Sequence, residues 1–207
     1  MASELLQIIR GRKKGTLALV AVNILVFIVL SAMGNTESAA FMYRHGACWA
    51  PDVQDGQYWR LVTSMFMHFG IVHLLYNMLC LFTLGDLLER ICGTFRFLLI
   101  YLAGGLIGNV VSVMIALRAR NMAVSAGASG CIFAVIGAIL WLVILNNGRL
   151  AGIRLNRMVL MIVLMAAQGF MDGGTDNAAH LGGLAAGFVI GVLMFRKRRR
   201  GAGSRRG

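Results

Sequence analysis

Two polar residues that open hydrophobic spans define the chemistry that this sequence can support. Ser129 stands in the tetrapeptide Gly127-Ala128-Ser129-Gly130 at the head of one span, and His180 stands at the head of another. A serine hydroxyl is a poor nucleophile unless a base lies beside it, and ionisable groups inside a membrane span are costly. The order of the spans predicts that both residues start parallel helices on one side of a membrane. We interpret the pair as candidates for serine hydrolysis inside a bilayer.

The composition indicates an integral membrane protein. Hydrophobic residues make up 58% of the chain and charged residues only 14%. The mean hydropathy of +0.76 is far above that of an ordinary globular domain. Crossing about 30 Å of hydrocarbon takes roughly 17 to 25 apolar residues. Six runs approach or reach this length: 16–33, 70–89, 95–117, 129–145, 157–172 and 179–195.

The predicted fold is an all-α bundle of six transmembrane helices in one domain. Only helices and closed barrels satisfy their backbone groups in lipid. The sequence lacks the alternating ten-residue segments of a barrel. We expect the membrane domain at 16–195, between a basic N-terminal segment at 1–15 and a basic tail at 196–207.

Basic residues set the predicted orientation, because lysine and arginine in short loops are retained on the cytoplasmic side. With the N-terminus inside, 16 of the 20 basic residues are cytoplasmic. We therefore expect a multi-pass protein of the inner (plasma) membrane with both termini in the cytoplasm. The densest basic run, from Arg196 to Arg200, follows a span directly and has no aromatic residues between its charges. This pattern indicates an anchor that touches anionic lipid, and no nucleic-acid partner is expected.

Neither a metal site nor a disulfide framework is expected from the cysteines. Cys80, Cys92 and Cys131 lie in or at the ends of spans, where a thiol packs as a small apolar group. His45 and Cys48 have the spacing of two zinc ligands, but no second pair follows them. We expect no metal and no cofactor.

The longest connection, 34–69, separates the first two spans. It is too long to be a bare loop in a compact bundle, and apolar side chains are scattered along it. We expect it to fold on or partly into the outer leaflet.

Polar residues on three parallel spans are predicted to lie at one depth. His73 and Asn77, four residues apart, share one face of the span 70–89. Counting about 1.5 Å per residue down to the inner boundary places His73, Ser129 and His180 each about 24 to 26 Å from it. The three side chains therefore agree in depth within a helical turn, a little below the outer surface.

Small residues recur every fourth position on two of these spans: Gly183, Gly187 and Gly191 on one, and Gly130, Ala134 and Ala138 on the other. Such faces let two backbones approach closely, which would bring His180 to hydrogen-bond distance of Ser129. Packing alone is the competing interpretation, since a serine in a small-residue face is often simply small. Gly182 points about 100° away on the same helix and is expected to tolerate added bulk better.

The residue types then suggest roles. Ser129 would attack a carbonyl, and His180 would remove its proton and later protonate the leaving amine. The backbone N–H of Ser129, at a helix start, together with His73 and the Asn77 amide, would stabilise the developing oxyanion.

The sequence predicts a dyad rather than a triad. No acidic residue occurs in the spans 129–145 and 179–195, and Asp172 and Asp176 are assigned to the outer loop. Packing would then orient the imidazole. Phe133, one turn after the serine, is placed to stack on it.

These residues resemble the motifs of the rhomboid family of intramembrane serine proteases, over about 59–195. The matching motifs, in order, are Trp59-Arg60, His68, His73-x-x-x-Asn77, Gly85 and Glu89, Gly127-Ala128-Ser129-Gly130, and His180 followed by Gly183 and Gly187. The resemblance implies a six-helix fold whose termini are both cytoplasmic in bacterial members. It also implies single-span membrane proteins as substrates, cut at small residues near the outer end of their helix.

Site roles follow from the same resemblance. It implies that Ser129 and His180 form a catalytic dyad. It also implies that His73, Asn77 and the backbone around Ser129 form an oxyanion hole. His68 matches a family position near the path of the active-site water.

Other positions match supporting parts of the family. Trp59-Arg60 matches a motif that holds the first loop in shape. Phe133 stands where the family often has tyrosine, so stacking on an imidazole is kept and a phenolic hydrogen bond is lost. The fifth span and the loop 171–178 match the mobile gate and cap that admit a substrate helix.

Two alternatives from other classes stay open at this point. An inactive rhomboid-like membrane binding protein would keep the fold but lack the nucleophile or the base, and this chain has candidates for both. A channel or small transporter would be expected to show an inverted repeat or a charged pathway through the midplane, and neither is visible in the sequence. Labelling with a fluorophosphonate probe, which reports an activated serine, separates these classes.

Overall fold

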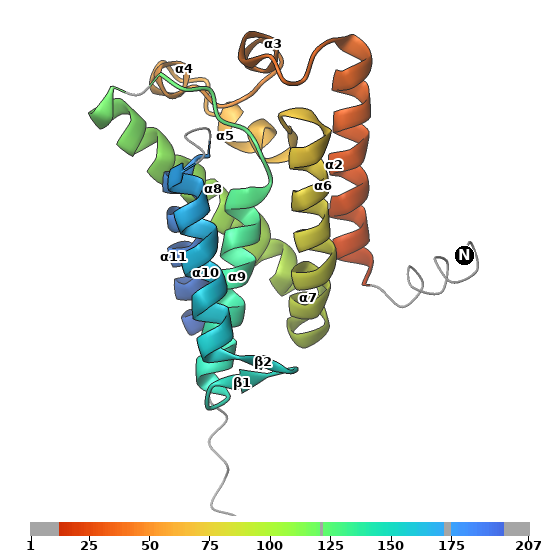
Figure 1. Ribbon diagram of the computed structural model, residues 1–207, viewed down its shortest axis with the longest axis vertical. Coiled ribbons are helices and arrows are strands. Elements are labelled where there is room, and N and C mark those ends of the chain that lie inside the picture. The colour runs from red at the N-terminus through yellow and green to blue at the C-terminus, as the bar shows by residue number, and fades with distance from the viewer. Residues whose placement is uncertain (1–12, 121, 172–174, 197–207) are drawn as a thin grey trace, which may run out of the picture.

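The computed structural model describes residues 13–120, 122–171 and 175–196, and its long helices coincide with the predicted spans (Figure 1). They are α2 (Lys14–Met33), α6 (Gly70–Cys80) with its continuations η2 (Leu81–Gly85) and α7 (Asp86–Cys92), α8 (Thr94–Ala119), α9 (Ser129–Leu145), α10 (Leu155–Met171) and α11 (Asn177–Met194). Four segments, α2, α6 to α7, α8 and α11, are long and apolar enough to cross a membrane, whereas α9 and α10 provide shorter apolar stretches. The prediction of an all-α membrane bundle is confirmed.

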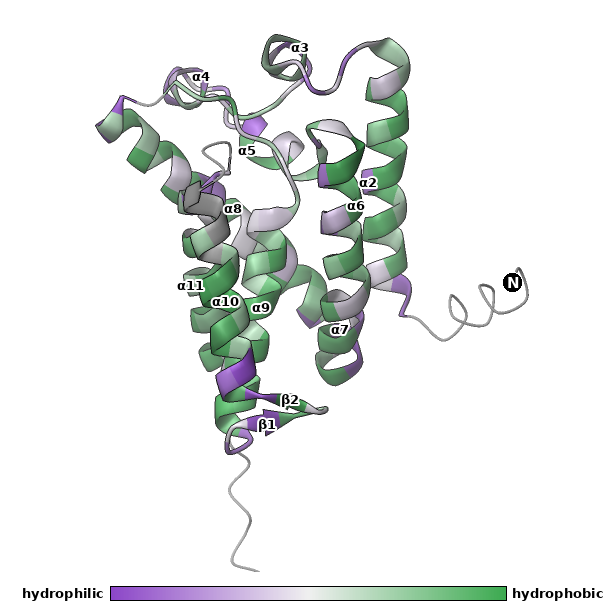
Figure 2. Ribbon diagram, in the orientation of Figure 1, coloured by the Kyte–Doolittle hydropathy of each residue, from purple (hydrophilic) through white to green (hydrophobic). Residues whose placement is uncertain are grey.

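The outward faces of the bundle are apolar. Leu25, Leu75, Leu160 and Leu193, on four different helices, are each more than half exposed. Figure 2 shows hydrophobic colour along most of the length of the helices and hydrophilic colour mainly toward the two ends. Soluble monomers rarely expose apolar surface on this scale, so this surface is suited to lipid.

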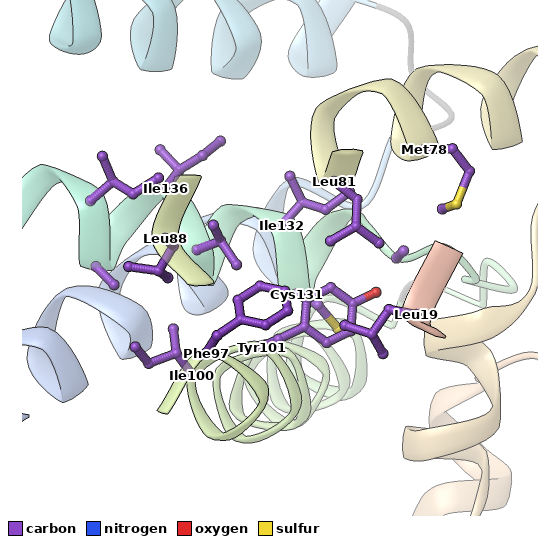
Figure 3. Close-up of a cluster of buried hydrophobic side chains, with 14 of the residues drawn as sticks. Leu19, Met78, Leu81, Leu88, Phe97, Ile100, Tyr101, Cys131, Ile132 and Ile136 are labelled. Carbon is purple, nitrogen blue, oxygen red and sulfur yellow. The ribbon is translucent and has the colours of Figure 1, made fainter. Parts of the chain in front are cut away.

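The helix α9 lies at the centre of the bundle, with α8 and α11 as its main neighbours. Twelve of its 17 residues are buried, as expected for a helix that is hydrophobic on all sides. Figure 3 shows part of this core, in which Phe97 and Tyr101 of α8 lie beside Cys131 and Ile132 of α9, with Leu88 of α7 nearby. The core fixes the helix whose first residue is Ser129.

Small residues bring α11 against α9 in the register that the sequence predicts. The facing pairs are Gly183 with Gly130, Gly187 with Ala134 and Gly191 with Ala138. A Cβ at Gly183 or Gly187 would overlap the carbonyl oxygen of its partner, so the two backbones touch without intervening side chains. The predicted contact between these faces is confirmed.

A third small-residue face on α8 was not predicted. A Cβ at Gly108 would lie 2.7 Å from the Ala179 carbonyl oxygen of α11, and a Cβ at Gly182 would lie 2.9 Å from Cβ of Val111 on α8. Gly182 is therefore buried against α8 and is not the open position that the sequence analysis expects. The start of α11 is enclosed by α9 on one side and by α8 on the next.

The connection 34–69 folds into short helices at one end of the bundle (Figure 1). They are α3 (Ala39–Arg44), α4 (Ala50–Gln54), α5 (Arg60–Thr63) and the 3₁₀ turn η1 (Ser64–Phe66). Met42, Leu61 and Met65 are buried, and each lies in a different hydrophobic cluster, so the apolar residues of this connection pack against the bundle helices.

Arg60 ties this connection together. Its guanidinium forms an ion pair with Asp52 at 3.0 Å and donates hydrogen bonds to the carbonyl oxygens of Tyr43 and Ala47 at 2.8 and 2.9 Å. The guanidinium carbon also lies 4.7 Å from the centre of the Trp59 ring. The contacts of Arg60 thus join residues from different parts of the connection 34–69.

The other end of the bundle carries a β-hairpin that was not predicted. β1 (Arg149–Leu150) pairs antiparallel with β2 (Ile153–Arg154). Ala151 and Gly152 between them have φ angles of 47° and 82°, and positive φ at both central positions is typical of a type I′ turn. An open groove of about 740 Å³ lies between the hairpin and α10, at the opposite end of α9 from Ser129.

Glu89, near the end of α7, forms hydrogen bonds to the starts of α2 and α8. Its buried carboxylate accepts hydrogen bonds from the N–H groups of Gly15 and Thr16 at 2.9 and 2.7 Å. It also accepts from the hydroxyls of Thr16 and Thr94, both at 2.7 Å. Because the first amides of a helix lack intrahelical partners, Glu89 caps α2 from another helix.

We expect Glu89→Gln to lower the free energy of unfolding by about 2 kcal/mol, because an amide nitrogen would face donors and leave buried N–H groups unsatisfied. Thermal unfolding in a fixed detergent measures the change. Glu37→Gln, the same substitution in the outer connection, is the control and should shift the midpoint little. Equal shifts in the two variants would contradict the capping role.

Candidate active site

Ser129 and His180 are in direct contact. Ser129 is the first residue of α9, and His180 lies in the first turn of α11. Nε2 of the imidazole is 2.7 Å from Oγ of the serine, a hydrogen-bond distance. The contact depends on the close approach of α9 and α11, because both side chains project from helix starts that small residues hold together.

The imidazole of His180 is held by stacking. The ring of Phe133 lies parallel to it, with centroids 4.3 Å apart and an interplanar angle of 10°. This is the contact expected from the position of Phe133 one turn after Ser129. Nδ1 of His180 has no hydrogen-bond partner among the described residues, so no described carboxylate orients the ring.

His73, on α6, approaches the serine across Gly127. A Cβ at Gly127 would lie 2.9 Å from Cε1 and 3.0 Å from Nε2 of His73, and 3.5 Å from Oγ of Ser129. The φ of +147° at Gly127 is also one that side chains disfavour. Position 127 thus favours glycine, both for its backbone conformation and for the space that the His73 imidazole occupies. His73 and Ser129 lie on the same side of Gly127.

His68 supports this arrangement from the segment before α6. Its ring makes an edge contact with the ring of His73 at 5.2 Å, and Nε2 accepts a long hydrogen bond of 3.4 Å from the N–H of Ala128. Burial and the neighbouring His73 lower the pKa of His68 to about 3, so the ring stays neutral and able to accept. His68 therefore contacts both His73 and the backbone just before Ser129.

Asn77 lies one turn below His73 and is buried. Its Nδ2 donates to the carbonyl oxygen of His73 at 2.9 Å. Because an amide NH₂ carries two donors, one N–H of Asn77 is engaged within its own helix and a second is left. The remaining predicted residues support the surrounding fold. Gly130, Gly183 and Gly187 lie in the contact between α9 and α11, and Trp59-Arg60 lies in the outer connection.

Asp176 is a polar residue whose contacts near the site are not predicted from the sequence. It precedes the first residue of α11, in agreement with its predicted place in the outer loop, and it caps that helix, since Oδ1 accepts from the N–H of Ala179 at 2.9 Å. Oδ2 accepts from the hydroxyls of Ser112 and Ser125 at 2.6 and 2.7 Å. An aspartate placed just before an apolar run is an N-cap signal that was available in the sequence. Asp172, the other acid of that loop, lies outside the described residues.

The fold and this contact define a polytopic membrane protein with a serine and a histidine paired between two packed helices. The family model of the Rhomboid domain matches residues 55–197. The chain belongs to the rhomboid family, whose members include intramembrane serine proteases.

Individual relatives agree with this assignment. The rhomboid protease GluP of Bacillus subtilis (strain 168) is 33% identical over 184 residues, which cover 89% of this chain and 35% of GluP. YdcA of the same bacterium is 35% identical over 149 residues, covering 72% of this chain and 73% of YdcA. RHOMBOID-like protein 5 of Arabidopsis thaliana is 36% identical over 148 residues, covering 69% of this chain and 46% of that protein. The chain thus spans about a third of GluP and most of YdcA.

Proposed function

We propose that this protein is an intramembrane serine endopeptidase in which Ser129 is the nucleophile and His180 the general base. The observation that carries the proposal is the 2.7 Å contact between His180 Nε2 and Ser129 Oγ, at the starts of two apolar helices. A base within hydrogen-bond reach is what activates a serine hydroxyl. Similarity to GluP, which is named a rhomboid protease, supports the same activity.

The proposed reaction proceeds through an acyl-enzyme. Ser129 Oγ attacks the scissile carbonyl carbon while Nε2 of His180 takes the hydroxyl proton. The tetrahedral intermediate collapses as the imidazolium gives that proton to the leaving amine, and water repeats the sequence to free the acyl group. For Nε2 to accept, the ring proton must reside on Nδ1. Stacking on Phe133 then keeps the ring in place, and no group among the described residues bonds its Nδ1.

Three groups are proposed as oxyanion donors. The N–H of Ser129 is the first amide of α9 and so has no intrahelical acceptor. The imidazole of His73 lies on the same side of Gly127 as Oγ of the serine. The second N–H of Asn77 completes the set from the adjacent turn of α6. Donors fixed in advance stabilise the charge that develops on the carbonyl oxygen.

We further propose that both termini are cytoplasmic in the inner (plasma) membrane and that the site opens toward the outer face. The excess of basic residues at the termini and in the loops at the hairpin end supports this orientation. Transmembrane proteins are the proposed substrates, cut near the outer end of their helix. The membrane domain at 16–195 carries the reaction, with no metal or cofactor in any step.

A fluorophosphonate probe tests the proposal directly. The protein reconstituted in lipid vesicles should form a covalent adduct, and peptide mass spectrometry should locate that adduct on Ser129. A transmembrane substrate in the same vesicles should be cut once near its outer end. A folded protein that forms no adduct and cuts no substrate would overturn the assignment.

Replacing an oxyanion donor should weaken the enzyme without silencing it. Loss of one such donor costs on the order of 10² to 10³ in rate. For Asn77→Ala we expect kcat to fall by roughly this factor while the probe still labels Ser129 slowly. Turnover within about twofold of the unmodified protein would reassign Asn77 to packing within α6, where its Nδ2 already bonds the His73 carbonyl oxygen.

A further inference from the structure

The carboxylate of Asp176 joins three separate segments around the candidate dyad. Oδ1 accepts from the N–H of Ala179 in α11, and Oδ2 accepts from the hydroxyls of Ser112 in α8 and Ser125 in the segment before α9. The three bonds are 2.9, 2.6 and 2.7 Å long. Hydrogen bonds to an ionised acceptor are roughly twice as strong as neutral ones. This tie therefore constrains all three segments at once.

The positions of the tied residues match the positions of the reacting pair. Asp176 precedes His180 by four residues, and its backbone carbonyl accepts from the His180 N–H at 3.1 Å. Ser125 precedes Ser129 by the same four residues. A bond between Asp176 and Ser125 thus fixes the start of the base helix relative to the entry into the nucleophile helix.

Ser125 also links Asp176 to the outer connection. Ser125 and Cys48 exchange two backbone hydrogen bonds, each 2.8 Å long, and Ala47 beside Cys48 accepts from Arg60. A continuous set of bonds therefore runs from the Arg60 guanidinium through Ser125 to Asp176. Asp176 is thus linked to the outer connection through Ser125.

The described hydrogen bonds of the Asp176 carboxylate do not reach the imidazole of His180. The side-chain oxygens accept from Ala179, Ser112 and Ser125, while Nδ1 of His180 has no partner within the described part of the chain. Asp176 is therefore not a third member of a triad.

We propose that Asp176 is a positioning residue that sets the distance between His180 and Ser129. The inference rests on the proposed function of that pair. A cap that serves only stability would need the Oδ1 bond alone. The two serine hydroxyls on Oδ2 supply the additional constraint, because they come from the segments that flank α11.

The decisive variant is the double substitution Ser112→Ala with Ser125→Ala. It removes both hydroxyl hydrogen bonds to Oδ2 of Asp176 and keeps the bond from the Ala179 N–H to Oδ1. We expect kcat for a transmembrane substrate to fall about 10- to 100-fold, because a displacement of about 1 Å can cost 10²-fold in rate. KM should stay within about twofold, since neither hydroxyl is expected to contact the substrate. Asp176→Ala should lower kcat at least as far. Combined with the double variant it should add little, because both act through one constraint.

Asp176→Asn provides the conservative rescue. It keeps the Oδ1 acceptor and an isosteric group that the two hydroxyls can still bond, so kcat should recover to within about tenfold of the unmodified protein. Ser38→Ala is the matched control. It removes a side-chain cap on the Phe41 N–H of α3, at 3.3 Å, and should leave kcat unchanged. Hydrogen exchange at 177–181 should quicken in the double variant.

The outcomes separate this inference from the proposed function. If the unmodified protein neither labels with a fluorophosphonate nor cuts substrate, the proposed function has failed. If it does both, and the Ser112→Ala, Ser125→Ala variant keeps kcat within about twofold, Asp176 is a helix cap only and the positioning role is wrong. Should Asp176→Ala fail to fold, the double serine variant decides alone.

Discussion

Ser129→Ala and His180→Ala should each abolish cleavage of a transmembrane substrate while leaving a folded protein that extracts normally. Groups that act as a unit are strongly non-additive, so the double variant should be no slower than either single one. We expect turnover to fall by about 10³-fold or more in each case, since neither alanine leaves a nucleophile with a base beside it. Cleavage in vesicles and probe adduct formation measure the loss.

The control for this prediction is Thr83→Ala, which deletes another hydroxyl within a membrane helix. The Thr83 hydroxyl donates to the Leu79 carbonyl oxygen of its own helix at 2.8 Å, and no role in the site is proposed for it. Its variant should retain full turnover. Substantial cleavage by purified Ser129→Ala would refute the assignment of the nucleophile.

The membrane spans and the serine–histidine contact were accessible from the sequence for definite physical reasons. Lipid requires long apolar helices, so hydropathy alone locates α2, α6 to α7, α8 and α11. Polar residues are rare and costly there, so Ser129 and His180 stand out, and the small residues at four-residue intervals predict how their helices meet. The structure contains the α9 and α11 contact in that register.

The parts that were missed depend on contacts between distant segments. Asp176 lies before a helix and carries a local cap signal, but nothing in its neighbourhood reveals that Ser112 and Ser125 will meet its second oxygen. Gly108 of α8 likewise has no local signal for a contact with Ala179. Such pairings follow from the packed bundle, whereas hydrophobic periodicity describes one element at a time.

Gly183→Val and Gly187→Val should each lower kcat by a large factor, whereas the midpoint of thermal unfolding should fall only modestly. A Cβ at Gly187 would overlap the Ala134 carbonyl oxygen, and one at Gly183 would overlap the Gly130 carbonyl oxygen. Because both overlapped atoms belong to the backbone, rotation of a side chain cannot relieve the overlap. The two helices must therefore separate. Overpacking of this kind costs roughly 1 to 3 kcal/mol.

The matched control for the glycine variants is Ala185→Val, which adds bulk to an exposed position on the same helix between the two glycines. Gly182→Ala does not serve, since its Cβ would press on Val111 of α8.

The separation of α9 and α11 acts on the reaction through the 2.7 Å contact between His180 and Ser129. A hydrogen bond weakens steeply beyond its normal range, and a shift of about 1 Å can reduce catalysis by 10²-fold. Gly183 lies one turn below the imidazole and Gly187 two turns below it, so Gly183→Val should lower kcat more. Probe labelling should slow in parallel with cleavage, because both need the activated hydroxyl. If both valine variants retain full activity, the close pairing of α9 and α11 does not hold the dyad, and the geometric basis of the proposed mechanism is lost.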